Sequence, residues 1–474
     1  MVAYRLSQLH PLARYPGPLL CKVSALWLAY KSTSGTQHRY VKSLHDRYGD
    51  VVRIGPNNLS IRRGSAISAL LGASGMPKGP HHIGRHFSVK NPDLLSIPDT
   101  EHHLRRRRAW ARGLTSKALK EYEEQMALRV SQLVSRLQEQ KGEVHIDEWF
   151  NRFTYDFMSD MALGGGSNLL DGEKTDFWSS LNEEAKPATF FGHVPWLGVL
   201  VGRLPIPNGH KMFIEQCRVQ AVRRMQRGTT APDLFYYISH EDVQDSKYAR
   251  PTIDQILSDG ILAMVAGSDT IATTLTAVVA CLLTYPAVYK QLQEEVDRFY
   301  PPGEVVHTKH HQEMHYLTAV INETLRLFSA VPSTTQRKVP SHGQGITVES
   351  LYIPPGTSFW VPAYSIHRDP RDFSPSPEAY LPERWLPEWK EASAAHVHNE
   401  GAFIPFSYGP MNCVGKGLAM QEMRMVVCAL LQRFKLRPRQ GWDITDYEGG
   451  LKDYFVTVRE HLPVILEPRG KNID

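Results

Sequence analysis

Cys413 is the residue whose surroundings best fit a chemical role. It stands just before an amphipathic stretch, 415–434, that is expected to form a helix. A cysteine at such a place meets unpaired backbone N–H groups and the positive end of the helix dipole, which favour the thiolate over the thiol. Gly409 and Gly415 let the backbone turn tightly and approach a flat ligand without Cβ clashes. Phe406 is placed to fold back and shield the sulfur.

This segment resembles the signature of the cytochrome P-450 superfamily, which is Phe-x-x-Gly-x-Arg-x-Cys-x-Gly. Phe406, Gly409, Cys413 and Gly415 match four of the five fixed positions, and Met411 stands where the arginine is usual. The resemblance implies haem b, iron protoporphyrin IX, held by Cys413 as axial thiolate ligand, with Phe406, Gly409 and Gly415 against the cofactor. Such a ligand pushes electron density onto the iron and favours O–O cleavage.

A second motif, Ala266-Gly-Ser-Asp269-Thr270, lies inside the long apolar stretch Ile261–Leu283. A mid-helix glycine costs about 1 kcal/mol, and a mid-helix threonine can bond back to the carbonyl four residues earlier and bend the helix. The motif resembles the family's oxygen-activation motif, which implies that Thr270 acts through its hydroxyl and that Asp269 relays protons. The alternative is a notch of small residues for packing. In lipid Asp269 would cost at least ~2.5–3.5 kcal/mol, so the stretch is interpreted as a buried core helix.

Glu323 and Arg326 are three residues apart on one expected helix face, where opposite charges attract. Together with Arg384 in Pro-Glu-Arg-Trp they resemble the family's Glu–Arg–Arg triad. Removing one partner of a buried ion pair costs ~3–5 kcal/mol.

Met411 leaves one haem propionate without its usual arginine, and charge-assisted hydrogen bonds are each worth ~1.5–3 kcal/mol. His103 and Arg107, at i,i+4 spacing, resemble the family's Trp-x-x-x-Arg pair, and Arg337 occupies another family propionate position. We therefore expect His103, Arg107 and Arg337 to hold the propionates. Arg106 and Arg108 are expected to belong to a solvated helix face.

The elements that must position these residues are mostly helical. A β-hairpin is expected where Val51–Ile54 and Leu59–Arg62 flank Gly-Pro-Asn. Helical spacing recurs over 101–141, 150–162, 253–284, 286–300, 313–328 and 415–434, and strands are expected around 347–352, 358–362 and 451–466. The fold class is mainly α with a small β subdomain. The resemblance implies the cytochrome P-450 fold, with haem between the long central helix and the cysteine loop.

Length and composition exclude several classes of protein. The 474 residues would suit two or three domains or one large one, and no repeat or linker marks a cut. We expect residues 1–18 to be an N-terminal segment and Pro-rich hinge without a spanning helix, and 19–474 to be a single catalytic domain. The net charge of +5 does not indicate a nucleic-acid partner. Five cysteines without a CxxC pair argue against a disulfide scaffold and an all-cysteine zinc site.

The resemblance implies a monooxygenase that activates O₂ to oxidise a lipophilic small molecule. Expected substrate contacts are Ile261–Met264 and Ala330–Thr334, both largely apolar. No glycine-rich dinucleotide fingerprint follows a strand, so electrons are expected from a separate NADPH-dependent flavoprotein reductase. The amino-acid sequence around Cys413 is most similar to that of fungal family members of specialised metabolism, which often oxidise terpenoids.

Membrane contact is a further expectation. The apolar segment Phe190–Ile206 is interrupted by His193, Pro195, Arg203 and Pro205, so it cannot span a bilayer as one helix, but its composition suits the interface. The alternative is an ordinary buried loop. Peripheral association with the cytosolic face of the endoplasmic reticulum membrane is expected.

Three rival functions remain open at this stage. A zinc hydrolase could use His311 and His315 at i,i+4 on a helix, although Glu313 is one place off the H-E-x-x-H order. A non-catalytic haem protein would explain Cys413 but would not need Asp269 and Thr270. A haem-thiolate isomerase or dehydratase would consume no reductant.

Overall fold

Helices account for most of the described chain, which in this computed structural model comprises residues 1–73, 75–86, 91–174, 177–204, 209–228, 232–243, 250–301, 304 and 306–469. The α-helices are α1 (Val2–Leu6), α2 (Leu19–Val23), α3 (Ala25–Ser32), α4 (Gln37–Tyr48), α5 (Ile67–Leu71), α6 (His81–Arg85), α7 (Thr100–Gly113), α8 (Ser116–Glu121), α9 (Glu123–Gln138), α10 (Ile146–Leu163), α11 (Phe177–His193), α12 (Pro195–Val201), α13 (Gly209–Arg227), α14 (Leu234–Ile238), α15 (Ile253–Thr284), α16 (Pro286–Phe299), α17 (His315–Leu327), α18 (Ala363–Ile366), α19 (Pro387–Glu391), α20 (Lys416–Arg433) and α21 (Ile444–Gly450). Short 3₁₀ turns are η1 (Gly64–Ala66), η2 (Leu169–Asp171), η3 (Pro382–Trp385), η4 (Glu400–Ala402) and η5 (Gly409–Met411).

The strands form small sheets. They are β1 (Val51–Gly55), β2 (Asn58–Ile61), β3 (Glu143–His145), β4 (Arg337–Lys338), β5 (Ile346–Val348), β6 (Leu351–Ile353), β7 (Ser358–Trp360), β8 (Phe373–Ser374), β9 (Val397–His398), β10 (Phe434–Pro438), β11 (Lys452–Tyr454), β12 (Val456–Val458) and β13 (Pro463–Pro468). One sheet has the order β1-β2-β7-β4 and a second has the order β10-β13-β3, while β11–β12, β5–β6 and β8–β9 are two-stranded.

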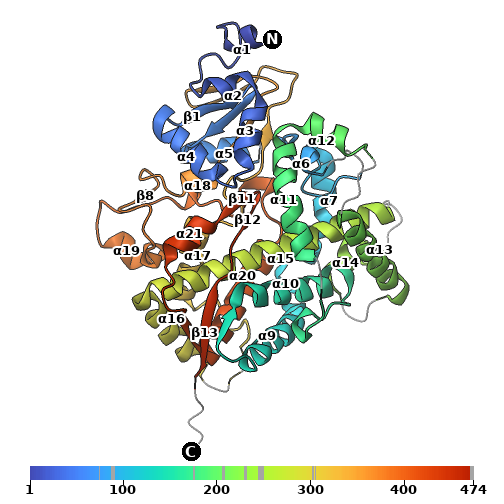
Figure 1. Ribbon diagram of the computed structural model, residues 1–474, viewed down its shortest axis with the longest axis vertical. Coiled ribbons are helices and arrows are strands. Elements are labelled where there is room, and N and C mark those ends of the chain that lie inside the picture. Colours follow the sequence, from blue (N-terminus) through green and yellow to red (C-terminus); the bar gives the residue numbers. More distant parts are fainter. Residues whose placement is uncertain are drawn as a thin grey trace, which may run out of the picture.

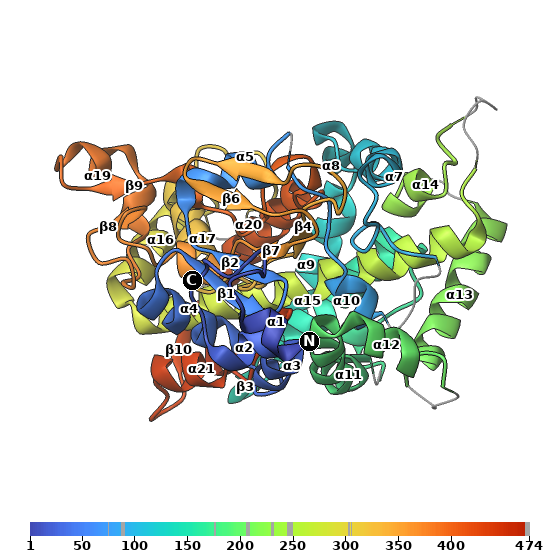
Figure 2. The ribbon, with the colours of Figure 1, turned by 90° about the horizontal axis from the view of Figure 1, so that it is seen from above.

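Helix α15 runs through the middle of the molecule (Figures 1 and 2) and packs against α10, α17 and α20. A capping box starts it: the Thr252 hydroxyl accepts from the Gln255 N–H, and the Gln255 side chain accepts from the Thr252 N–H. By length and composition it is the one helix of the described chain that could cross a bilayer, yet 78% of its most apolar window is buried inside the protein. This arrangement agrees with the interpretation as a core helix.

The first sheet lies in the upper part of Figure 1 with α2, α3 and α4 beside it. Its strands contribute Leu59, Ile61 and Phe359 to a separate buried cluster. β2 pairs with β7 in parallel although the two strands are far apart in the sequence, and β7 pairs with β4 antiparallel. An isolated bridge between Lys78 and Arg337 extends this sheet toward the cysteine side of the molecule.

The expected elements are largely present. The hairpin β1–β2 forms around Gly55-Pro56-Asn57, and α15, α16 and α20 lie where helical spacing placed them. The pattern over 101–141 is divided among α7, α8 and α9, because Thr115 turns the chain and caps α8 with its hydroxyl. The pattern beginning at 313 becomes helical only at His315.

Candidate active site

Cys413 lies in the turn between η5 and α20. Its backbone N–H donates to the carbonyl oxygen of Phe406 at 2.8 Å, so the segment folds back on itself as expected. Gly409 has a φ of +74°, and a Cβ there would collide with the carbonyl oxygen of Leu71, which leaves glycine as the residue that fits. A Cβ on Gly415 would lie 3.9 Å from the Cys413 Sγ. Gly409 is therefore required for the tight turn, while a side chain at Gly415 would only touch the sulfur.

Cys413 is the one cysteine of the five whose side chain is exposed. Although its sulfur touches open space, the surrounding protein raises the pKa of the thiol by burial; N–H groups of Gly415 and Lys416 and the Arg107 guanidinium oppose the rise. The N–H groups at the start of α20 thus lower the pKa of Cys413, as expected, but burial raises it by more. A cation bound to the sulfur would supply the missing stabilisation, since metal coordination deprotonates a thiol.

The motif in α15 has the expected internal bond. The Thr270 hydroxyl donates to the carbonyl oxygen of Ala266 at 2.7 Å. A Cβ on Gly267 would lie 2.5 Å from the Met158 sulfur, so the glycine lets α10 approach α15 closely. The packing interpretation is therefore correct for Gly267, while the side chain of Thr270 remains partly exposed.

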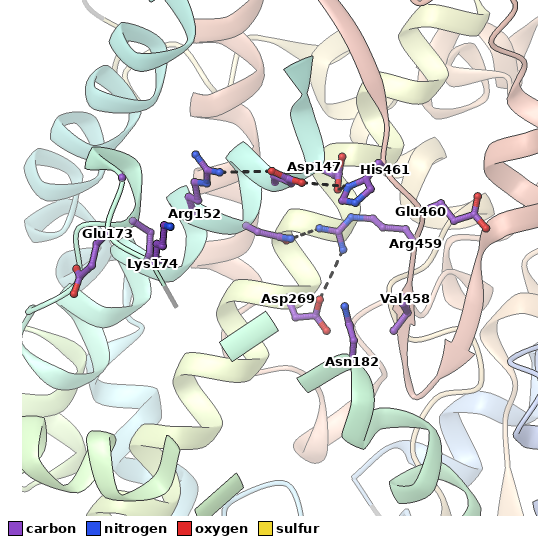
Figure 3. Close-up of a pocket in the computed structure, with 14 residues that line it drawn as sticks. Asp147, Arg152, Glu173, Lys174, Asn182, Asp269, Val458, Arg459, Glu460 and His461 are labelled. Carbon is purple, nitrogen blue, oxygen red and sulfur yellow. Dashed lines mark hydrogen bonds and ion pairs between the residues drawn. The ribbon is translucent and has the colours of Figure 1, made fainter. Parts of the chain in front are cut away.

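Asp269 faces a pocket of about 960 Å³ on the other side of the same motif (Figure 3). Arg459 stands between its carboxylate and α10. One guanidinium nitrogen of Arg459 donates to Thr273 Oγ1 at 2.6 Å and lies 3.8 Å from Asp269, and the other donates to Asn151 Oδ1 at 2.6 Å. Burial raises the pKa of Asp269 to about 6, although Arg459 opposes the rise. Asp269 can therefore gain and lose a proton near neutral pH, beside a pocket wide enough for water.

The expected propionate ligands lie around the cysteine turn. Arg107 donates to the carbonyl and side-chain oxygens of Asn412, both at 2.6 Å. Arg337 is 1% exposed and one of its nitrogens contacts the Met411 sulfur at 2.8 Å. His103, one turn before Arg107 on α7, is also buried.

Lys78 is a further buried cation next to His103 and Arg337. It was not identified from the sequence. Its Nζ donates to the Leu94 carbonyl at 2.9 Å and lies 3.4 Å from His103 Nδ1. Burial, with the neighbouring Arg337, lowers the pKa of Lys78 to about 7. A lone lysine between Pro77 and Gly79 carries no periodic signal, so only its place in the fold identifies it.

The carboxylates nearest these cations act on them only at a distance, as Asp93 and Asp259 do on Lys78. Within the described ranges, no carboxylate forms an ion pair with Lys78, Arg107 or Arg337. His103 Nε2 and two nitrogens of Arg337 are buried without a hydrogen-bond partner. Because each buried unsatisfied polar group costs roughly 1–3 kcal/mol, the cluster fits an anion with several acceptor oxygens. Two propionates beside an exposed thiol match this requirement, so the residues present fit a haem.

The Glu–Arg–Arg triad is assembled as expected. Glu323, Arg326 and Arg384 are all 0% exposed. Arg326 binds both Glu323 oxygens at 2.8 and 2.7 Å, and Arg384 Nε donates to Oε1 at 3.0 Å. Burial alone would raise the pKa of Glu323, but the two guanidinium groups outweigh it and lower the pKa. The triad joins α17 to η3, and Trp385 of η3 completes it with a bond at 3.0 Å.

One expectation about another side chain is wrong. Arg106 does not face solvent: it forms a bond of 2.7 Å with the buried Asp259, whereas Arg108 is exposed as expected. The zinc alternative also fails, because buried His311 precedes α17 and exposed His315 is its first residue, so the two do not share a helix face.

A group of buried imidazoles is a second feature that sequence reasoning missed. His81 and His82 of α6 and His193 of α11 are each at most 5% exposed, and each has one ring nitrogen without a partner. Phe455, at the tip of the β11–β12 hairpin with a φ of +86°, lies 4.9 Å from the His82 ring. The same hairpin is tied by Asp453 to Ser333, inside the segment expected to contact substrate.

Comparison with known proteins agrees with this site. The cytochrome P-450 family model matches residues 14–460. The chain is 33% identical to a cytochrome P-450 monooxygenase of Fusarium pseudograminearum, over 99% of this chain and 84% of that protein. It is 31% identical to one of Hypoxylon pulicicidum, over 100% and 86%. It is 30% identical to the tryprostatin B 6-hydroxylase of Neosartorya fischeri, over 97% and 83%.

The fold has a counterpart among solved structures. A crystal structure of a cytochrome P-450 superposes with a TM-score of 0.76, covering 96% of this chain and 99% of that one. The sequence identity is 19%, so this likeness concerns the fold alone.

Proposed function

The chain belongs to the cytochrome P-450 family and is a haem-thiolate monooxygenase, and from that premise we propose that it hydroxylates or otherwise oxidises a lipophilic intermediate of fungal specialised metabolism. O₂ and a separate reductase are the partners that the family requires. Relatives about 30% identical are named as tryprostatin B 6-hydroxylases, which favours hydroxylation as the reaction. The expected terpenoid substrate has no support in these names.

The observation that carries the proposal is the uncovered thiol of Cys413 beside buried cations without an anion. Haem bound there supplies the redox chemistry that splits O₂. Thr270 offers a hydroxyl on the partly exposed side of α15, and Asp269 holds an exchangeable proton next to it. Arg459 orients the Asp269 carboxylate at the inner end of the pocket, so that pocket is the proposed path of protons from solvent.

The propionates are assigned to His103, Arg107 and Arg337, as the sequence suggested, with Lys78 added. Lys78 replaces the cation that Met411 does not supply, since it is buried next to Arg337 and lacks a carboxylate partner. Its low pKa supports this role, because a neighbouring dianion would restore the charge of the ammonium.

The substrate is proposed to carry at least one hydrogen-bonding group. The rings of His81 and His82 contact Phe455, and His193 contacts His81; each of the three has one ring nitrogen without a partner. Burial lowers the pKa of each of these histidines, so they act as neutral donors and acceptors. An apolar substrate alone would leave them unpaired, at roughly 1–3 kcal/mol each.

Peripheral association with the cytosolic face of the endoplasmic reticulum membrane is proposed for the face formed by α1, α2, α3, α11 and α12. These helices contact one another in that order (Figure 2). Leu9, Leu19 and Trp196 on or beside them are 83%, 69% and 67% exposed. Apolar side chains presented together on neighbouring helices suit insertion into a bilayer interface.

A reduced carbon monoxide difference spectrum of the purified protein tests the central proposal without knowledge of the substrate. The wild type is expected to show the thiolate-haem band and Cys413→Ser to lose it. Incubation of the enzyme with candidate lipophilic substrates, a reductase, NADPH and ¹⁸O₂ is then expected to place one ¹⁸O atom in a product, the other leaving as water. A product formed without reductant would favour the isomerase or dehydratase, and a thiolate band without any turnover would favour the non-catalytic haem protein.

A further inference from the structure

Two histidines far apart in the sequence, His145 and His461, meet beside the pocket that Asp269 lines. β3 pairs with β13 so that His145 lies opposite Pro463, and His461 precedes that proline by two residues. The two imidazole rings stack with their centroids 4.6 Å apart and an angle of 16° between the planes. Asp147 and Glu148 follow in the first turn of α10, so two imidazoles and two carboxylates share one spot.

The distances within this cluster are close to those of a metal site. His461 Nδ1 and His145 Nδ1 are each 3.6 Å from Glu148 Oε1, and one ligand atom from each of the three residues lies within 4.8 Å of the others. Zinc bonds of about 2.0–2.2 Å in a tetrahedron place ligand atoms about 3.3–3.6 Å apart. Two edges of such a tetrahedron are thus already present. The third edge, between the two histidine nitrogens, requires the stacked rings to rotate. All three side chains are accessible from solvent, since the least exposed, Glu148, is 41% exposed.

Asp147 lies beside this group and contacts His461. Its Oδ2 lies 3.0 Å from His461 Nδ1, while its Oδ1 accepts the backbone N–H of Leu462 at 2.9 Å. Arg152 lies 3.5 Å from the second oxygen of Glu148, which leaves Oε1 for a metal. Two carboxylates neutralise a divalent cation, and outer partners that fix the ligands are usual at such sites.

We propose that His145, Glu148 and His461 bind one zinc ion, with water in the fourth position and the Asp147 carboxylate beside the site. Two imidazole nitrogens exclude the hard cations Ca²⁺ and Mg²⁺, which prefer oxygen ligands alone, and the absence of a thiolate does not matter for zinc. The ion would join the β12–β13 connection to the start of α10. Glu148, His461 and Asp269 all line one pocket, in which Figure 3 labels His461 and Asp269, so the ion would lie at the wall of that pocket.

Zinc titration of the chelator-treated holoenzyme tests the site. Isothermal titration calorimetry is expected to give one ion per chain, and zinc is expected to raise Tm with saturation, because a ligand that binds the native state stabilises it. His145→Ala and His461→Ala are each expected to weaken binding at least tenfold. His342→Ala, an exposed histidine in another loop, is the matched control and should leave binding unchanged. Asp147 is left intact because it also holds the Leu462 backbone.

Zinc K-edge absorption distinguishes this site from the cysteine. Nitrogen and oxygen neighbours at about 2.0 Å support the proposal, and a sulfur neighbour would place the ion on a thiol instead. The carbon monoxide difference spectrum of each variant controls for haem loading, so loss of zinc with an intact spectrum separates this site from the proposed enzyme function. Absence of binding by the wild type, or equal binding by the His145→Ala/His461→Ala double variant, overturns the proposal.

Discussion

Individual residues around Cys413 divide the task of holding a charged, flat cofactor. In the proposed assignment the Cys413 sulfur would bind the haem iron, while Lys78, His103, Arg107 and Arg337 would hold the propionates. The charged forms of Lys78, Arg107 and Arg337 are unfavourable there by themselves because burial disfavours them, and burial also lowers the pKa of His103 to about 3, so that His103 is neutral. The site is therefore organised for an anion that arrives with the cofactor.

The first prediction concerns Lys78. Lys78→Met is expected to speed haem transfer to apomyoglobin about 10- to 100-fold, since a charge-assisted hydrogen bond is worth ~1.5–3 kcal/mol. Lys78→Arg should restore most of the retention. Lys338→Met, a partly exposed neighbour on β4, is the control. If Lys78→Met keeps haem as tightly as the wild type, the other three residues suffice and the assignment is wrong.

The second prediction concerns Asp269 and pH. Its pKa is about 6 in the folded protein and 3.8 for an ordinary aspartate, so the native state binds more protons between these values and stability falls as pH rises through that window. Asp269→Asn removes this cost. Relative to wild type it should be about 1 kcal/mol more stabilising at pH 8 than at pH 5, because each pKa unit is worth about 1.4 kcal/mol.

Urea unfolding at the two pH values measures this difference. Asp446→Asn, an exposed carboxylate, serves as the control and should show no such dependence. Steady-state turnover of Asp269→Asn is expected to drop while the carbon monoxide spectrum is retained. A pH-independent effect on stability would mean that Asp269 does not titrate as described.

Residue chemistry was predictable where partners are close in sequence. The spacing of Phe406, Gly409, Cys413 and Gly415 is fixed within one turn, so the cysteine ligand could be identified directly. Lys78 and Arg459 could not, because their partners come from strands and helices far away in the chain. Arg106 was misjudged for the same reason: its partner Asp259 belongs to another helix.

At the scale of elements, the long helices were the most predictable. α15 is marked by an apolar run and a capping box, and α20 by the glycines before it. The pairing of β2 with β7 and of β3 with β13 was not predictable, since short strands carry little pattern and their partners are distant. The cysteine turn depends on such contacts, because Gly409 is pressed against Leu71 at the end of α5.

The third prediction tests how α17 and η3 support the cofactor. Glu323→Ala leaves two buried guanidinium groups without their carboxylate, at a cost of ~3–5 kcal/mol. The variant is expected to lack a Soret band in the soluble fraction. Glu388→Ala, an exposed carboxylate at the start of α19, should load haem normally. A soluble Glu323→Ala protein with full haem content would contradict this role.

At the scale of the whole molecule, the buried site and the apolar outer face lie on connected helices. α11 contacts α6, which carries His81 and His82, and also contacts α3 and α12, which carry exposed apolar side chains. A lipophilic substrate dissolved in a membrane would thus meet this face before it reached the imidazoles. The fold class could be predicted from helical spacing. The position of the buried histidines next to the apolar face could not, because it depends on tertiary contacts between α3 and α11.

The fourth prediction is that this face binds lipid. A double change, Leu19→Ser with Trp196→Ser, is expected to lower binding to phosphatidylcholine vesicles at least tenfold, because burying each large apolar side chain contributes about 1.5–3 kcal/mol. Flotation with vesicles measures the bound fraction. Leu128→Ser on α9, equally apolar and 62% exposed, is the matched control and should bind like wild type. Equal flotation of all three proteins would show that the face does not contact the bilayer, and the exposed leucines would then need another partner.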